Sequence, residues 1–507
     1  MHDIFLYSAL GTLILWSLFD LKHGSIASLC KITFAISFFG LLLSLFAIED
    51  KLGNQVIHLS LDLLIISSGA FIFQKLRNNK TLIILLSALF IYGIPKLHQR
   101  FLQSSVLSDK ENIYDTAAEL LVEFREGYDL IDIRTIEKKY NIRLRRAFFP
   151  EITENTTLDN YYYADLPDFL DVKNLSGSII TESEIIWSEP NEILRVPKSA
   201  SPLIDMKIQR KNAAINDPMV AQQWSTDKLN YTELHQFLQS KNIQPVKTAL
   251  VAVLDSGVDA NHEDIAANYR SIKPAYDKDG NSHGTHCAGI VAAVSYNKIG
   301  IVSMVPSPDW LQVTSVRVMN RLGVGTQKAT IGGIIEATDY GVDVISFSIG
   351  GVSNQSREKA YKEAVAYANE QGTIVVVAAG NNSSNAKYTT PANAEGVIAV
   401  ASIDQNMNKS VFSNTMEDIK MPIAAPGTDV LSLIPENNYK KNSGTSMATP
   451  HVSALIGLMK SLRPDLDTKT AYEILSRTGK SSDDNLLTGK IIYPLGAIKA
   501  LVGLDPT

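Results

Sequence analysis

Three short segments of this sequence put polar side chains where the loops of a buried fold would converge. VAVLDSGVD ends an apolar run in Asp255, NSHGTHCAGIVAA opens a helical run with His283 in its first turn, and GTSMATPHV places Ser446 at the start of another. A serine hydroxyl is a weak nucleophile at neutral pH, so it needs a base within about 3 Å, and a neutral imidazole is the usual one. The imidazole in turn needs a carboxylate that orients it and stabilises its cation. These residue types therefore predict nucleophilic catalysis, provided that the fold brings them together.

The elements around these residues predict such a fold. From about Thr248, short apolar runs such as ALVAVLD, VDVISFSIG, TIVVVAAGN and GVIAVASID alternate with helical stretches such as REKAYKEAVAYANEQG. Strands that are apolar throughout must be covered on both faces, which predicts an α/β domain with a doubly wound, mostly parallel sheet. In such sheets the carboxyl ends of strands and the amino ends of helices meet along one edge. Asn381 closes another apolar strand at that edge, where its amide and the backbone N–H of Ser446 could stabilise the oxyanion of acyl transfer.

The same segments resemble the subtilisin-like serine protease family. DSGVD, HGTHCAG and GTSMATPHV match its signatures and occur in the order Asp, His, Ser that subtilisin has. The resemblance extends from about Asp217 to near the end of the chain. It implies that Asp255, His283 and Ser446 form the catalytic triad and that Asn381 is the oxyanion residue.

The resemblance also implies roles for residues near the triad. His286 is expected to be a structural histidine, and Cys287 a buried packing residue that is not placed as a nucleophile. The residues that resemble the two walls of the specificity pocket and the strand that pairs with substrate are Ser348, Ile349 and Gly350, then Ala378, Ala379 and Gly380, and finally Gly323, Val324 and Gly325. No acidic residue marks the pocket walls, so an apolar or broad preference is expected.

A structural calcium ion is a further implication of the resemblance. Asp264 and Asn297 match two side-chain positions of the family's calcium site, where oxygen ligands would brace a loop. Asp and Asn are also common in ordinary turns, so the sequence leaves calcium binding open. No cofactor is expected for catalysis itself.

Residues 111–195 have the composition of a small α+β module. Its candidate strands and helices predict a ferredoxin-like arrangement, and the closing IIWSEPN resembles the subtilisin propeptide. That resemblance implies an intramolecular inhibitor and chaperone whose tail lies along the active-site cleft. Residues 196–216, with prolines, small residues and a dibasic pair, predict an exposed linker, which is either an ordinary surface loop or the place where the protease cuts its own chain.

The first hundred residues differ from the rest of the chain. Four apolar stretches separated by short polar segments predict about four transmembrane helices in residues 1–100. A buried soluble bundle is the alternative, but these runs are apolar on all faces rather than along one stripe. The lysines and arginines that follow the first and third runs favour a cytoplasmic location for those turns, so residues 217–507 would be extracytoplasmic.

Composition narrows the function classes. The chain has 507 residues, with 47 Lys and Arg against 53 Asp and Glu, and this balance gives no basic surface for nucleic acid. Only two cysteines occur, which excludes a disulfide framework. We therefore expect a multi-pass, membrane-anchored, extracytoplasmic serine endopeptidase that acts on proteins or peptides. The alternative is a receptor or scaffold that keeps a protease-like ectodomain to bind peptides without cleaving them.

Overall fold

The fold is described from a computed structural model of the chain. It describes residues 118–154, 156–166, 172–191, 193–195, 216–352 and 355–506. All of them belong to the second of the two units into which the chain divides, Glu111–Thr507. The predicted membrane region and nearly all of the predicted linker lie outside the described residues. Within these ranges, none of the helices combines the length and the hydrophobicity that a membrane span requires.

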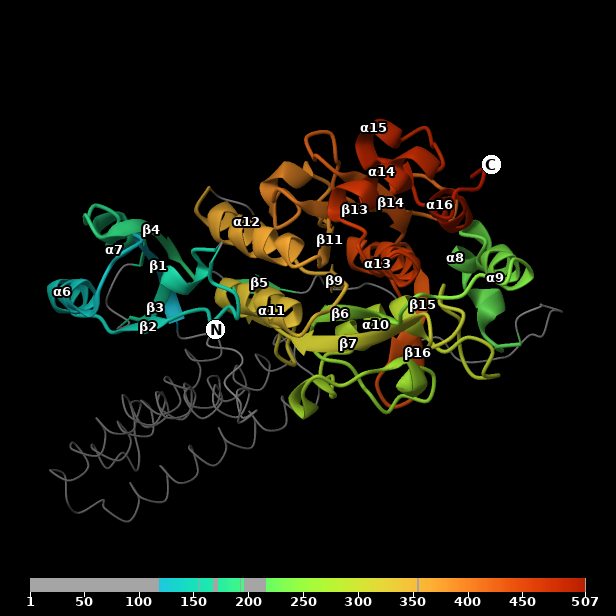
Figure 1. Cartoon of the computed structure of the whole chain (residues 1–507), viewed down its shortest axis with the longest axis horizontal. Coiled ribbons are helices and arrows are strands. Elements are labelled where there is room, and N and C mark those ends of the chain that lie inside the picture. The colour runs from blue at the N-terminus through green and yellow to red at the C-terminus, as the bar shows by residue number, and fades with distance from the viewer. Residues whose placement is uncertain are drawn as a thin grey trace, which may run out of the picture. The chain divides into compact units, whose positions relative to one another are not determined.

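A seven-stranded sheet forms the centre of the α/β domain, residues 216–506 (Figure 1). All of its paired strands run parallel, which confirms the parallel sheet expected from the uniformly apolar runs. In spatial order the strands are β17 (Lys490–Ile491), β14 (Pro422–Pro426), β13 (Val397–Ile403), β11 (Ile374–Ala378), β9 (Val344–Phe347), β6 (Ala249–Asp255) and β7 (Leu311–Arg317).

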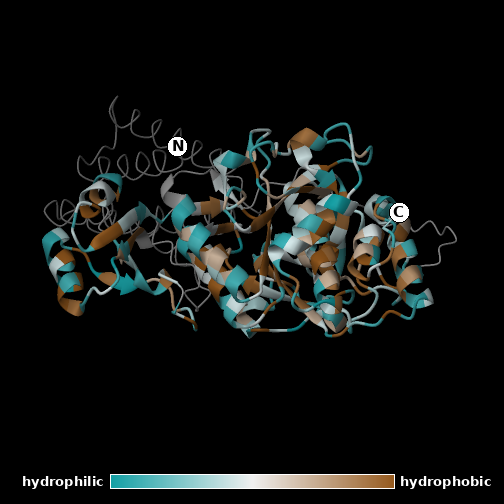
Figure 2. Ribbon diagram, turned by 45° about the horizontal axis from the view of Figure 1, so that its top comes forward, coloured by the Kyte–Doolittle hydropathy of each residue, from teal (hydrophilic) through white to brown (hydrophobic). Residues whose placement is uncertain are grey.

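Helices cover both faces of this sheet. On β6, Val251 and Val253 pack into one core cluster together with helices α10 (His283–Ala292) and α13 (Thr445–Leu462). Leu250 and Leu254, whose side chains point the other way, join the cluster of α11 (Gln327–Asp339) and α12 (Gln355–Glu370). In Figure 2 the central strands are mostly coloured as hydrophobic, as expected for a sheet buried on both faces.

The strand order reverses next to β6. The chain passes from β6 through α10 to β7 at one edge, and then through α11 to β9 on the other side of β6. Loops at the carboxyl ends of β6 and β9 therefore diverge to opposite faces and leave room between them, which is where doubly wound sheets bind ligands.

Shorter elements complete the α/β domain. They are α8 (Trp224–Lys228), α9 (Tyr231–Ser240), β8 (Val324–Thr326), β10 (Gly351–Val352), β12 (Thr389–Thr390), β15 (Val430–Ile434), β16 (Asn438–Asn442), α14 (Thr468–Thr478), α15 (Asn485–Thr488) and α16 (Pro494–Leu501). β15 and β16 pair as an antiparallel hairpin that packs against α10.

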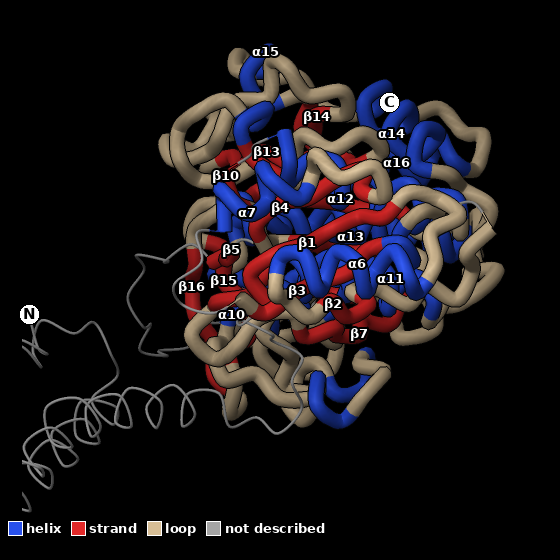
Figure 3. Tube along the Cα trace, turned by 90° about the vertical axis from the view of Figure 1, so that its left-hand side faces the viewer, coloured by secondary structure: helices blue, strands red, loops and turns tan. Residues whose placement is uncertain are grey.

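The described part of residues 118–195, here called the module, is a four-stranded antiparallel sheet with two helices. The order along the chain is β1 (Ala118–Phe124), α6 (Leu130–Tyr140), β2 (Leu144–Arg146), β3 (Tyr161–Asp165), α7 (Val172–Ile179) and β4 (Ile185–Pro190). The spatial order β2-β3-β1-β4 corresponds to the βαββαβ arrangement of ferredoxin-like folds. Figure 3, seen from the side of the module, shows α6 and α7 in front of its sheet.

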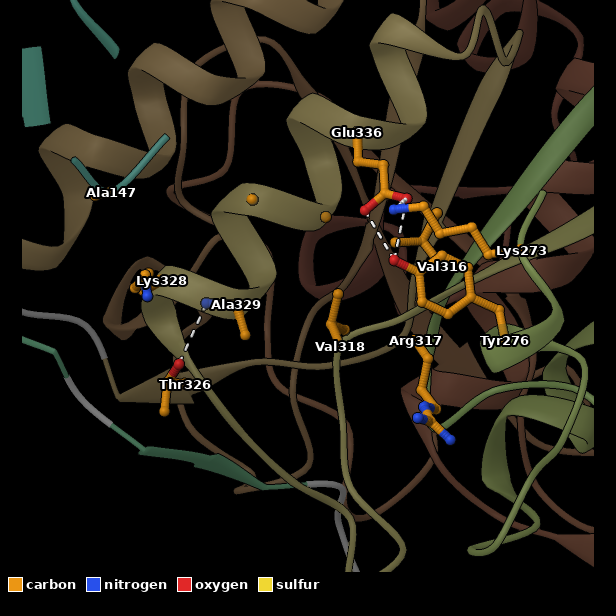
Figure 4. Close-up of a pocket in the computed structure, with 12 residues that line it drawn as sticks. Ala147, Lys273, Tyr276, Val316, Arg317, Val318, Thr326, Lys328, Ala329 and Glu336 are labelled. Carbon is orange, nitrogen blue, oxygen red and sulfur yellow. Dashed lines mark hydrogen bonds and ion pairs between the residues drawn. The ribbon is translucent and has the colours of Figure 1, made fainter. Parts of the chain in front are cut away.

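The other face of the module packs against α11 and α12. Phe148, Leu158 and Tyr161 are at most 2% exposed and belong to the core cluster of those helices. Glu123 on β1 is also buried and forms an ion pair with Lys359 on α12. Ala147 of the module also borders a cavity of about 250 Å³ next to α11 (Figure 4). In this cavity, Glu336 accepts hydrogen bonds from Tyr276 and forms an ion pair with Lys273.

Candidate active site

Asp255 and His283 are brought together at the carboxyl edge of the sheet. Asp255 is the last residue of β6, and His283 is the first residue of α10. The Nδ1 atom of His283 lies 2.8 Å from Oδ2 of Asp255, and both side chains are buried. This bond assigns the Nδ1 proton to the Asp255 side of the ring and leaves Nε2 as the atom that can take a proton.

The Asp255 carboxylate also controls the protonation of His283. Burial alone would lower the pKa of the imidazole, but the charge of Asp255, the neighbouring Cys287 and the hydrogen bond of Asp255 together outweigh it and raise the pKa of His283 well above its usual 6.5. The pair can therefore hold a proton on His283 while a reaction is in progress, which is what general base catalysis requires.

Ser446 lies in the first turn of α13 and is 3% exposed. Its Oγ donates a hydrogen bond to the backbone oxygen of Ser348 at 2.9 Å, and Ser348 Oγ donates to the backbone oxygen of Ser446 at 3.0 Å. The Ser446 hydroxyl is thus bonded to a main-chain oxygen and not to His283 in this structure. A proton transfer from Ser446 to Nε2 of His283 would require the hydroxyl to leave Ser348 first. Hydrogen bonds of this kind often tighten only when substrate is bound.

Cys287 lies between the histidine and the serine. Its Sγ is 3.9 Å from Nδ1 of His283 and 3.4 Å from the backbone oxygen of Ser446. Burial raises the pKa of the Cys287 thiol, which keeps it protonated and makes it a packing residue. His286 lies on the same helix as His283. Its Nε2 contacts the backbone oxygen of Lys440 at 2.9 Å, and burial lowers its pKa to about 3.

Asn381 follows β11 at the same edge. Its Oδ1 accepts hydrogen bonds from the backbone N–H and the hydroxyl of Thr445, both at 2.9 Å. Because Oδ1 faces these donors, the Nδ2 end of the amide lies next to Gly444. A Cβ built on Gly444 would be 3.2 Å from Nδ2. The Nδ2 group of Asn381 and the backbone N–H of Ser446 are thus the donors available for a developing oxyanion.

A small cavity of about 60 Å³ adjoins Ser446. The residues that line it are Ser348, Gly350, Gly351, Ala378, Gly380, Asn381, Asn382, Thr389, Thr445 and Ser446. Four of the six predicted wall residues are among them. The other two, Ile349 and Ala379, are fully buried in the core cluster of α11 and α12, because successive residues of an extended chain point to opposite sides.

Thr389 is a lining residue that the sequence did not single out. Its Cγ2 lies 3.1 Å from the position of a Cβ on Gly350 and 3.3 Å from that of a Cβ on Gly380, so it closes the cavity between the two glycine walls. Asn414 Nδ2 donates to its Oγ1 at 2.9 Å and holds it there. The residue types at 388–390 do not by themselves show which side chain points inward.

The predicted substrate-pairing strand is occupied by the chain's own residues. β5 (Ile193–Arg195) pairs antiparallel with β8, with Leu194 opposite Gly325. Leu194 is 1% exposed and joins the core cluster of the α/β domain. Gly325 is required here because a Cβ at this position would lie 2.3 Å from the backbone oxygen of Val318.

Comparison with known proteins agrees with this geometry. Residues 247–490 match the family model described as the subtilase family. The chain is 40% identical to thermitase from Thermoactinomyces vulgaris over 252 residues, covering 48% of this chain and 85% of thermitase. The chain belongs to the subtilase family.

Two further relatives support the assignment. Subtilisin DY from Bacillus licheniformis is 38% identical over 247 residues, covering 47% of this chain and 86% of that protein. A solved structure of a protease from Pseudoalteromonas arctica is similar with a TM-score of 0.50 and 27% identity, and covers 57% of this chain and all of that one. This subtilase is a subtilisin-like serine endopeptidase.

A second cluster of the subtilase contains both predicted calcium ligands. Asp264 Oδ1 accepts a hydrogen bond from Asn297 Nδ2 at 2.7 Å, and its Oδ2 accepts from the backbone N–H of Ile301 at 2.8 Å. Asp217, which the sequence did not identify as a ligand, accepts from the backbone N–H groups of Tyr296 and Asn297. The structure thus brings Asp264 and Asp217 against the loop that carries Asn297.

The chemistry of this cluster fits a calcium ion. Asp217 and Asp264 are 2% and 0% exposed, and within the described ranges no Lys or Arg forms an ion pair with either carboxylate. Burial, with the nearby charges of Asp217 and Glu263, raises the pKa of Asp264 to about 8. Carboxylate and amide oxygens without a soft ligand are the donor set that Ca²⁺ prefers.

If Asn381 is an oxyanion donor, replacing it by alanine should lower kcat by about 10²- to 10³-fold with little change in KM, because such a donor acts on charge that develops only in the transition state. Steady-state hydrolysis of a chromogenic peptide would measure both constants. The exposed Asn406, in a surface loop, provides the control Asn406→Ala, which should behave as the unmodified enzyme. A loss confined to KM would contradict the assignment of Asn381.

Proposed function

We propose that this subtilase is made as a membrane-anchored zymogen with its α/β domain outside the cytoplasm, and that it cuts its own linker. Ser446 attacks the substrate carbonyl, and His283 takes the serine proton and then gives it to the leaving amine. Asp255 orients His283 and stabilises its cation, while Asn381 and the Ser446 backbone N–H bind the oxyanion. The hydrogen bond between Asp255 and His283 at the edge of the sheet is the main support for these roles.

The module acts as the inhibitor in this proposal. Its tail, β5, lies antiparallel on β8, which is how an extended peptide gains main-chain hydrogen bonds from a free edge strand. Upstream of β5, Glu189 accepts a hydrogen bond from Gln327 Nε2, and Asn191 accepts one from the backbone N–H of Lys328. A substrate cannot pair with β8 while the tail is bound, so the module must leave before the enzyme acts on other proteins.

The proposed membrane anchor rests on the sequence of residues 1–100. Four runs that are apolar on all faces favour membrane helices over a soluble bundle, and the positions of the basic residues favour an extracytoplasmic α/β domain. Cleavage between residues 196 and 216 would cut the covalent connection between that domain and the anchor.

Expression of the full chain beside its Ser446→Ala variant tests self-cleavage. We expect the unmodified chain to yield a fragment that begins within residues 196–216, identified by intact mass and amino-terminal sequencing, and the variant to remain at full length. A Ser446→Ala chain that still appears at the shortened size would show that another protease makes the cut. Fractionation of membranes in the same experiment tests the anchor, which requires the full-length variant to sediment with them.

Calcium is proposed as a structural ion held by Asp217, Asp264 and Asn297. If an ion at about 100 times its Kd is removed, the loss of about 2.7 kcal/mol should lower Tm on the order of 5 to 10 °C. Thermal unfolding of the Ser446→Ala protein with calcium or with a chelator measures this without self-digestion. Asp264→Asn should remove the response to calcium, and a chelator that leaves Tm unchanged would contradict the site.

A further inference from the structure

The loop in front of α10 is organised around Asp279, a carboxylate that has no part in the mechanism above. Its Oδ1 accepts hydrogen bonds at 2.9 Å from the backbone N–H groups of Asn281 and Ser282 and from the hydroxyl of Ser256. Its Oδ2 accepts from the backbone N–H and the hydroxyl of Thr285, at 2.9 and 2.7 Å. Five donors from three segments thus converge on one carboxylate.

Three of these donors belong to Ser282 and Thr285, which lie on either side of His283. Ser282, which precedes it, has φ of 85°, a left-handed conformation that costs energy for a residue other than glycine. Thr285, two residues after it, contributes one of the backbone N–H groups that are unsatisfied at a helix start. Asp279 therefore holds the strained entry to α10 and its first turn at the same time.

Ser256 connects this loop to the other half of the catalytic pair. Its Oγ donates to Asp279 and accepts the backbone N–H of Gly284 at 3.1 Å. Its own backbone N–H donates to Oδ1 of Asp255 at 2.8 Å, the oxygen that His283 does not use. The first turn of α10 also lies directly on the end of β6, since a Cβ on Gly284 would be 3.2 Å from the Cβ of Asp255.

We propose that Asp279 is a positioning residue for catalysis, which ties the end of β6 to the start of α10 so that Asp255 and His283 keep their separation during the reaction. It does not touch the reacting atoms and acts through Ser256, Ser282 and Thr285. A fixed acid–base geometry matters because small misplacements of catalytic groups cost far more in turnover than in folding stability.

Asp279→Asn is the informative variant. The asparagine keeps one acceptor oxygen but puts an NH₂ group where Oδ2 accepted from Thr285, so the first turn of α10 loses its acceptor while the size of the side chain is unchanged. The full chain would be expressed, its processed form assayed with a peptide substrate, and the concentration of active enzyme determined by titration with a fluorophosphonate. We expect kcat to fall by about 10- to 100-fold and KM to change by less than about twofold.

The pH profile separates positioning from general destabilisation. Activity needs neutral His283, so kcat/KM decreases as the pH drops below the pKa of His283. A looser contact with Asp255 stabilises the imidazolium less and therefore lowers that pKa. The acid limb should therefore move to lower pH in Asp279→Asn. The titratable groups that act on His283 are Asp255 on β6 and Cys287 and His286 on α10, and none of them is altered.

Asp277→Asn is the matched control, because Asp277 lies in the same loop but accepts from Tyr269 and Ser271 instead. It should retain the kcat and the acid limb of the unmodified enzyme. If Asp279→Asn does not fold, Ser256→Ala breaks the connection to Gly284 and should lower kcat by about 3- to 10-fold with the same direction of pH shift. Unchanged kcat in a folded Asp279→Asn protein, a loss only in KM, or an equal loss in Asp277→Asn would overturn the proposal.

Discussion

Replacement of Ser446 by alanine should lower kcat by about a millionfold while the protein stays folded. The hydroxyl is the group that would form the covalent bond to the substrate, and a triad that lacks its nucleophile loses nearly the whole benefit of the other two residues. The rate that remains would come from substrate binding and the oxyanion donors around Asn381. Peptide hydrolysis and labelling by a fluorophosphonate probe, both normalised to folded protein, measure the effect.

Ser461→Ala is a suitable control for this variant. Ser461 is also buried and lies on the same helix, α13, but its hydroxyl donates only to the backbone oxygen of Leu458. It should label and turn over substrate normally. Labelling of the Ser446→Ala protein at the normal rate would mean that a different residue is the nucleophile.

Asp255→Asn should lower kcat by about 10⁴-fold. An asparagine cannot carry the negative charge that stabilises protonated His283, and its NH₂ group favours the wrong tautomer of the ring. The effect should appear in kcat rather than in KM, because Asp255 is buried behind His283 and does not reach the substrate.

The pH dependence of this variant has a defined sign. Asp255 raises the pKa of His283 above 6.5, so in the unmodified enzyme the neutral base is lost as pH falls through that raised value. Without the carboxylate, burial lowers the pKa, and the acid limb of kcat/KM should move to lower pH. An acid limb that stays in place would show that Asp255 does not control the protonation of His283.

Much of the α/β domain was predictable because each signal was local. Apolar runs on both faces required a parallel sheet, and the ends of β6 and β11 and the starts of α10 and α13 carry the residues that were expected at the active edge. Residues 117–127 could form a strand or a short helix by their sequence, and they contain β1. Residues 132–142 have helical spacing and overlap most of α6.

The remaining residues depended on the conformation of turns. Thr389 enters the pocket, and Asp217 enters the cluster with Asp264, only because distant loops fold back on them. Ile349 and Ala379 were predicted as pocket walls because they belong to segments that resemble those walls. The direction of each side chain, however, depends on the local backbone. Asp279 lies four residues before His283 in the sequence, but the residue types alone did not indicate that five hydrogen-bond donors would converge on its carboxylate.

The strand order of the sheet also has a consequence for biosynthesis. β6 lies between the edge strand β7 and β9, and both of these neighbours come later in the chain. The helix that carries Ser446 comes later still, after β13, β14 and the β15–β16 hairpin. Such high contact order slows folding, because distant segments must meet before burial stabilises them. The module leaves the ribosome earlier and folds from nearer neighbours, so its sheet can be ready as a surface on which α11 and α12 assemble before any hydrolytic activity exists.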